Sequence, residues 1–146
     1  MVWATKRIKY CSILLLVILA VGCLAGVAYI AATTLMPYHL EYIGMSSADI
    51  QNFNPKLRNL IVGLIKMVGV YALLFHLSGI IITLIPFRQA ERWAWITLFT
   101  LGLFDFITML AATFYVGAWI KWGILVLAAL FLVAMLVPVR DFFHKR

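Results

Sequence analysis

The chain has 146 residues, of which 66% are hydrophobic and only 12% are charged. Together with a mean hydropathy of +1.07, this composition excludes an ordinary soluble domain, which is about half apolar, so lipid must be the solvent for most of the surface. The net charge of +7 does not indicate nucleic-acid binding, because the basic residues are scattered along the chain and form no patch beside a reading element.

Four apolar runs have a length close to the roughly 20 residues that a helix needs to cross a hydrocarbon core. The sequence therefore predicts an all-α, integral membrane four-helix bundle that forms a single transmembrane domain. The expected spans are residues 11–36, 57–85, 93–118 and 121–137. Two of them, joined by a short basic turn, form the helical hairpin around which we expect the rest of the chain to pack.

The charged and aromatic residues indicate how these spans are oriented. Most basic residues flank the two chain ends and the turn between the second and third spans, so the positive-inside rule places both termini and this turn in the cytoplasm. We expect a multi-pass protein of a prokaryotic plasma membrane, with anionic lipid headgroups as partners on the cytoplasmic side. The expected interface anchors are Trp3, Trp93, Trp95, Trp119, Trp122, Arg88 and Arg92.

The first apolar run has a basic start and a faint lipoprotein-like box before Cys23, which would suit a cleaved signal peptide. The run continues well beyond the 7 to 15 apolar residues of such a peptide, so we interpret it as a retained helix. Gly22 and Gly26 form a G-x-x-x-G pair, whose small side chains let two helices approach closely. This face is therefore expected to pack against another helix, although glycine is also simply common in spans.

The polar stretch between Pro37 and Pro55 is the expected external loop. Ser46 and Asp49 have the spacing of a capping box, which predicts a short helix lying at the outer interface. A metal site formed by His39, Glu41 and Asp49 is the alternative for this stretch. Their spacing matches no known ligand pattern, so we favour a solvated loop and predict no metal site.

The second span carries two ionisable side chains, Lys66 and His76. At 100° per residue, His76 shares a small and polar face that we expect to contact other helices. Lys66 lies far from the cytoplasmic end, near enough to the outer surface for its side chain to reach water. The residues on the face of His76 are Gly69, Ala72, Gly79 and Thr83.

The third span carries Asp105, next to the expected packing glycine Gly102. A carboxylate in hydrocarbon is costly, by about 3 kcal/mol on insertion scales, so Asp105 must be buried, paired or protonated. Asp105 and His76 lie at similar depths on antiparallel helices and come within reach if their faces meet. We therefore predict an intramembrane polar cluster of Lys66, His76 and Asp105, acting as an ion pair or as a relay.

Residues 44–50 read Gly-Met-Ser-Ser-Ala-Asp-Ile, residues 54–57 read Asn-Pro-Lys-Leu, and residues 87–95 read Phe-Arg-Gln-Ala-Glu-Arg-Trp-Ala-Trp. This combination resembles a large group of small four-span prokaryotic membrane proteins that share an Arg-x-Gly-Glu-Arg-Trp-Ala-Trp inner turn. The resemblance covers about residues 44–100. The group has no assigned activity, so the likeness implies the topology and adds no catalytic residue. Ala90 stands where the group has Gly, which predicts that the third helix begins slightly earlier here.

The fourth span is almost wholly Leu, Ala, Val and Phe, which predicts a wall facing lipid. The chain has no H-E-x-x-H and no G-x-S-x-G motif, so we predict neither an enzyme nor a bound cofactor. The first functional hypothesis is an accessory or structural subunit that packs beside other integral membrane subunits or beside copies of itself. The alternative is a proton-coupled transporter or ion relay that uses Asp105, His76 and Lys66. Lipid or quinone binding between the helices remains open.

Overall fold

The computed structural model describes residues 4–143, and every regular element within this range is helical. Trp3, which the sequence suggests as an interface anchor, lies outside the described residues. The elements are α1 (Lys6–Ala31), α2 (Pro37–Ile43), α3 (Ser47–Phe53), α4 (Pro55–Leu84), the 3-10 helix η1 (Phe87–Gln89), α5 (Arg92–Tyr115), α6 (Lys121–Leu136) and α7 (Val139–Phe143).

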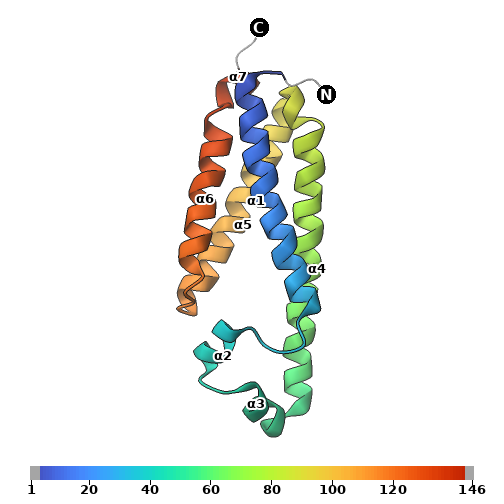
Figure 1. The fold of residues 1–146 in the computed structure, drawn as a ribbon, viewed down its shortest axis with the longest axis vertical. Coiled ribbons are helices and arrows are strands. Elements are labelled where there is room, and N and C mark those ends of the chain that lie inside the picture. Colours follow the sequence, from blue (N-terminus) through green and yellow to red (C-terminus); the bar gives the residue numbers. More distant parts are fainter. Residues whose placement is uncertain (1–3, 144–146) are drawn as a thin grey trace.

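Four helical segments are long and apolar enough to cross a membrane, which confirms the predicted all-α bundle of a multi-pass membrane protein. They are Lys6–Ala31, Pro55–Gln89, Arg92–Tyr115 and Lys121–Phe143. Both described ends of the chain lie beside η1 at one end of the bundle, and α2 and α3 lie at the other (Figure 1). We call these the inner end and the outer end. With 30 residues, α4 is about 45 Å long, so it extends past a hydrocarbon core of roughly 30 Å.

The first span begins and ends five residues earlier than the predicted 11–36. It begins at Lys6 because the Thr5 hydroxyl accepts a hydrogen bond of 3.1 Å from the backbone N–H of Ile8 and so caps the helix. It ends at Ala31 because Ala32 takes an extended conformation. Because the residues after Ala31 are still mostly apolar, the length of the apolar run predicted an end at residue 36, which is too late.

The outer segment contains two short helices where the sequence predicted one. The predicted helix is α3, with its capping box in place: the Ser46 hydroxyl accepts from the N–H of Asp49 at 3.1 Å, and the Asp49 carboxylate accepts from the N–H of Ser46 at 2.9 Å. The Ser46 hydroxyl also donates to the Asp49 carboxylate at 2.6 Å, and this bond, together with that from the N–H of Ser46, holds the pKa of Asp49 below its usual value. The additional helix, α2, begins at Pro37 and ends at Gly44, whose φ is +69°. Leu35, Ile50 and Ile65 are buried together and fix this segment against α4.

The inner turn leaves Ala90 outside the third span. Helix α5 begins at Arg92, one residue before the predicted 93, and Ala90 has a φ of +62°, the left-handed conformation that glycine adopts most easily. Its N–H donates to the carbonyl of Phe87 at 3.0 Å, and the N–H of Glu91 donates to the carbonyl of Pro86 at 3.1 Å. Ala90 therefore adopts a turn geometry that suits Gly.

The helices pair as α1 with α4 and as α5 with α6, and α6 also packs against α1. Helices α4 and α5 follow one another in the chain but have few contacts, and they diverge away from the inner turn (Figure 1). Helix α6, which the sequence predicts as a wall facing lipid, has two faces: Phe131, Ala134 and Met135 are buried in the bundle, whereas apolar residues such as Val126 and Leu130 are exposed. The main core lies in the inner half and contains Ile8, Leu15, Ile18, Phe87, Ala94, Leu98, Phe131, Ala134, Met135 and Phe142.

Candidate functional site

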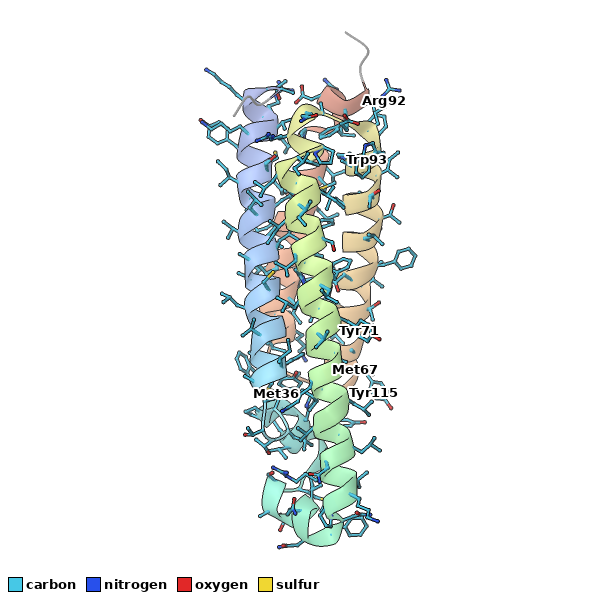
Figure 2. The ribbon with its side chains drawn as sticks, turned by 90° about the vertical axis from the view of Figure 1, so that its right-hand side faces the viewer. Met36, Met67, Tyr71, Arg92, Trp93 and Tyr115 are labelled. Atoms are coloured by element: carbon cyan, nitrogen blue, oxygen red, sulfur yellow. The ribbon has the colours of Figure 1, made fainter. Side chains whose placement is uncertain are left out.

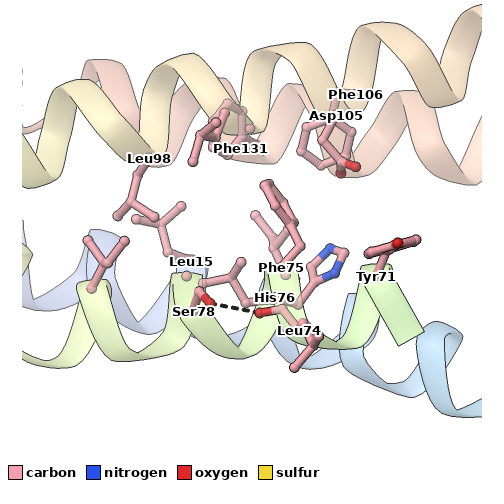
Figure 3. A pocket seen from close by; sticks show the side chains of 16 residues that line it. Leu15, Tyr71, Leu74, Phe75, His76, Ser78, Leu98, Asp105, Phe106 and Phe131 are labelled. Carbon is pink, nitrogen blue, oxygen red and sulfur yellow. Dashed lines mark hydrogen bonds between the residues drawn. The ribbon is translucent and has the colours of Figure 1, made fainter. Parts of the chain in front are cut away.

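A cavity of about 500 Å³ lies between α1, α4, α5 and α6 (Figure 3). Its walls are mainly apolar, and its polar side chains are Asp105 from α5 and His76, Tyr71 and Ser78 from α4. The apolar lining consists of Leu15, Ile18, Leu19, Leu74, Phe75, Gly79, Ile82, Leu98, Leu101, Gly102, Phe106 and Phe131. The cavity therefore encloses two of the three ionisable groups that the sequence indicated.

Asp105 reaches the cavity because the inner half of its helical face points into the bundle. Leu98 and Leu101, one to two turns further in on the same face, also line the cavity. Thr108 and Met109, on the outer half of this face, are exposed. The difference follows from the divergence of α4 and α5, which leaves the outer turns of α5 without a helix to cover them.

His76 is held by its own helix and by α1. Its Nδ1 lies 2.6 Å from the carbonyl oxygen of Ala72, and because a carbonyl only accepts, Nδ1 must carry the proton of this bond. Nε2 is then free to accept a proton or a hydrogen bond. The ring lies directly against Gly22 of α1, where a Cβ would overlap it. It also lies edge-on to Phe75, with ring centroids 5.2 Å apart.

The Asp105 carboxylate and the His76 ring stand on facing walls of the cavity (Figure 3). No hydrogen bond or ion pair joins Asp105 to another residue of the described range 4–143. A carboxylate in such surroundings is stabilised by taking up a proton or by binding a cation. The arrangement can therefore exchange one for the other at Asp105, with the His76 ring on the facing wall of the cavity.

Lys66 lies apart from this cavity. Its side chain is exposed, and it does not belong to the cavity lining. The neighbouring Met67 lies at the level of Met36 and Tyr115, close to where α1 and α5 end (Figure 2). Lys66 is therefore placed to extend toward the outer headgroups, and the structure does not bring it together with Asp105 and His76.

Tyr71 and Ser78 complete the polar lining and were missed in the sequence. The Ser78 hydroxyl donates to the carbonyl of Leu74 at 2.8 Å, and 65% of Tyr71 is exposed. Their spacing of seven residues puts both on one helical face, which was the available signal. That face lies beside the stripe of small and polar residues that contains His76.

The five predicted packing glycines all lie at contacts between helices. Gly26 and Gly69 mark the closest crossing of α1 and α4: a Cβ on Gly69 would lie 2.8 Å from the carbonyl oxygen of Gly26. A Cβ on Gly79 would lie 2.8 Å from a methyl of Leu19 in α1. Gly22 accommodates the His76 ring, and Gly102 accommodates the ring of Phe131 from α6. Gly79 and Gly102 also belong to the lining of the cavity.

The expected interface anchors divide into two sets. Trp93, Trp119 and Trp122 are exposed at the ends of the bundle. Trp95 instead packs inside, where its Nε1 donates to the carbonyl of Met135 at 2.8 Å and its ring stacks on Phe99.

The two predicted arginine anchors connect the inner turn to the chain ends. The Nε of Arg92 donates to the carbonyl of Phe142 at 3.1 Å. The carbonyl of Arg88 accepts from the N–H of Ala4 at 3.1 Å. The inner end of the bundle is therefore tied together through main-chain carbonyls.

No three His, Cys, Asp or Glu side chains gather into a metal-binding group anywhere in residues 4–143. In the outer segment, His39 is partly buried on α2, and this burial lowers its pKa. The carboxylate of Asp49 is engaged in the cap of α3.

Comparisons with protein-family models, with curated proteins and with solved structures give no match to this chain. The functional argument therefore rests on the cavity and its side chains.

Proposed function

We propose that the protein binds a small, largely apolar molecule with a cationic group in the cavity between its spans, and exchanges it for a proton at Asp105. The observation that carries this proposal is the carboxylate of Asp105, which is unpaired among the described residues and faces His76 across a mainly apolar cavity of about 500 Å³. Ligand pockets in proteins typically measure about 300–1,000 Å³ and combine apolar walls with few polar groups.

The aromatic walls favour a cation over a neutral ligand. Phe75, Phe106 and Phe131 all line the cavity, and so does Tyr71. Aromatic faces attract cations, by about 2 kcal/mol or more where water is excluded. A cation bound here would satisfy the carboxylate of Asp105 and leave its proton to His76 or to water.

Binding of tetraphenylphosphonium to the purified protein in detergent tests this function. We expect binding to weaken as pH falls, because protons compete for Asp105, and to be lost in Asp105→Asn. Glu41→Gln, which removes an exposed carboxylate of α2, should bind like the unchanged protein. Tetraphenylborate, an anion of the same shape, should not bind. Equal binding by Asp105→Asn and the unchanged protein would refute the role of Asp105.

An accessory subunit of a larger membrane assembly is the second candidate. The observation that favours it is an exposed apolar surface on α3 and on the outer turns of α4, where Phe53 is 77% and Leu60 is 60% exposed. This outer apolar surface, which also includes Leu57 and Leu64, lies where α4 extends beyond the other spans. Other integral membrane subunits or a second copy of the chain would cover it, and stoichiometric co-purification is the test.

We also propose that the protein resides in the cytoplasmic membrane of a prokaryote, with the inner end in the cytoplasm. The basic residues near η1 and near both chain ends support this orientation, and the resemblance in residues 44–100 supports the prokaryotic origin. A fluorescent protein fused to the C-terminus checks the orientation, because it should fluoresce only from the cytoplasmic side.

A further inference from the structure

The wall of the cavity is incomplete between α4 and α5. Four lining residues here are exposed on the outside of the bundle: Tyr71, Leu74 and Ser78 of α4, and Leu101 of α5. The exposed fractions of Tyr71 and Leu74 are 65% and 56%, and that of Leu101 is 46%. We call these four residues the α4–α5 seam. Because they lie midway along long apolar spans, the medium outside the seam is hydrocarbon.

The seam follows from the way in which the helices pair. Gly26 and Gly69 bring α1 and α4 into close contact, while Gly102 receives the Phe131 ring of α6. Each pair buries its small residues against its own partner, so no comparable small-residue contact holds α4 against α5. The two walls of the cavity, α4 and α5, therefore have few contacts with each other, and they are connected through α1 and α6.

A second cavity, of about 400 Å³, lies between the seam and the inner end of the bundle. Ile82 lines both cavities, and the inner one is completed by Ile81, Ile85, Pro86, Gln89, Glu91 and Trp93. Glu91 is exposed and accepts a hydrogen bond of 3.0 Å from Nε1 of Trp93. One carboxylate thus stands at the inner end of this path, and another, Asp105, stands at its deep end.

We propose that the ligand is a cationic amphiphile of the inner leaflet that enters sideways through the α4–α5 seam. Its charged head first meets Glu91 beside Trp93, then passes Ile82 to Asp105, while its apolar chain stays in the lipid outside the seam. This inference deepens the proposed function and rests on it for the role of Asp105. It adds that the ligand reaches the cavity from the membrane.

Spin-label accessibility in phosphatidylcholine bilayers tests the path separately from binding. In a chain with Cys11→Ala and Cys23→Ala, a nitroxide is attached at Ser78→Cys, with Leu74→Cys as a second seam position. Leu130→Cys on the exposed face of α6 is the lipid-facing control, and Gln51→Cys on α3 is the water-facing control. We expect seam labels to collide with oxygen as the label at 130 does, and to show little collision with a water-soluble nickel chelate.

Adding dodecylamine then tests the ligand. We expect it to remove most of the oxygen accessibility at position 78 and to leave position 130 unchanged, whereas dodecanol, with the same chain and no charge, should change neither. In Asp105→Asn the seam should stay open to oxygen, and dodecylamine should lose its effect.

The outcomes are distinguishable. Nickel accessibility at position 78 like that at position 51 would overturn the lateral path, because the cavity would open to water. Protection from both reagents would overturn it as well, since a second copy or a partner would then cover the seam. A lipid-accessible seam at which dodecylamine and dodecanol behave alike would overturn the cationic ligand, while loss of tetraphenylphosphonium binding in Asp105→Asn tests the proposed function independently.

Discussion

Ala90 shows how a single residue can keep a turn that its side chain disfavours. Its φ of +62° lies in the left-handed region, which costs a residue with a Cβ roughly 1–2 kcal/mol. The two hydrogen bonds that close the turn, from the N–H groups of Ala90 and Glu91, offset this cost. The turn joins α4 to α5 and so sets the angle at which the two walls of the cavity diverge.

We expect Ala90→Gly to raise the free energy of unfolding by about 1 kcal/mol, because it removes this strain. Denaturation of the protein in micelles, followed by circular dichroism, measures the change. Ala111→Gly is the matched control, since Ala111 is exposed within α5 and glycine there should lower stability by up to about 1 kcal/mol. A loss of stability in Ala90→Gly would contradict the assignment of strain.

At the scale of whole helices, the crossing of α1 and α4 depends on the absence of side chains at two positions. A Cβ on Gly69 would meet backbone atoms of Gly26 and Ile30 at 2.8 Å, and backbone cannot move aside without separating the helices. Gly63, two turns further out on the same helix, has no neighbour within 4 Å of an added Cβ. Identical substitutions at these two positions therefore isolate the effect of the crossing.

Gly69→Ala should lower the free energy of unfolding by about 1–3 kcal/mol, as overpacking of a close contact does. Gly63→Ala should be neutral or stabilising by up to about 1 kcal/mol, because Ala favours the helix more than Gly does. Unfolding in mixed micelles compares the two variants under one condition. If both variants were equally stable, α1 and α4 would not meet at Gly69.

The sequence predicted the spans and the buried faces of the helices, but not which helices contact one another. The lengths of the apolar runs predicted four spans, and the spacing of Gly69, Gly79 and Thr83 correctly indicated a buried stripe on α4. Because almost every face of a membrane helix is apolar, this pattern could not show that the stripe contacts α1 and not α5. For Lys66 the depth in the span predicted a side chain that reaches the outer surface, and the structure agrees with this and not with the grouping of Lys66 with His76 and Asp105.

For the molecule as a whole, the outer apolar surface is the feature that a partner would need. Its residues belong to α3 and to the outer turns of α4, which extend beyond the level at which α1 and α5 end (Figure 1). A partner or a second copy that binds here would remove apolar surface from water, which is favourable by about 25 cal/mol of free energy per Å² buried. The surface therefore gives the accessory-subunit candidate a specific place of contact, which is separate from the cavity.

Purification at native expression level in mild detergent, with mass spectrometry of the recovered complex, tests this contact. We expect Leu60→Asn to release any stoichiometric partner, and Asn59→Gln, an exposed neighbour on the same helix, to retain it. Recovery of the chain alone, before any substitution, would count against an accessory subunit and leave the cavity as the functional site.

The unpaired carboxylate of Asp105 also bears on how the chain enters the membrane during synthesis. Helix α5 has the lowest mean hydropathy of the four spans, 1.7 against 2.8, 2.2 and 2.6, and a central aspartate adds about 3 kcal/mol to the cost of insertion. On its own, α5 is therefore the span that leaves the translocon for lipid least readily. Because α4 is made first and carries His76, it offers α5 a polar neighbour at the moment of insertion.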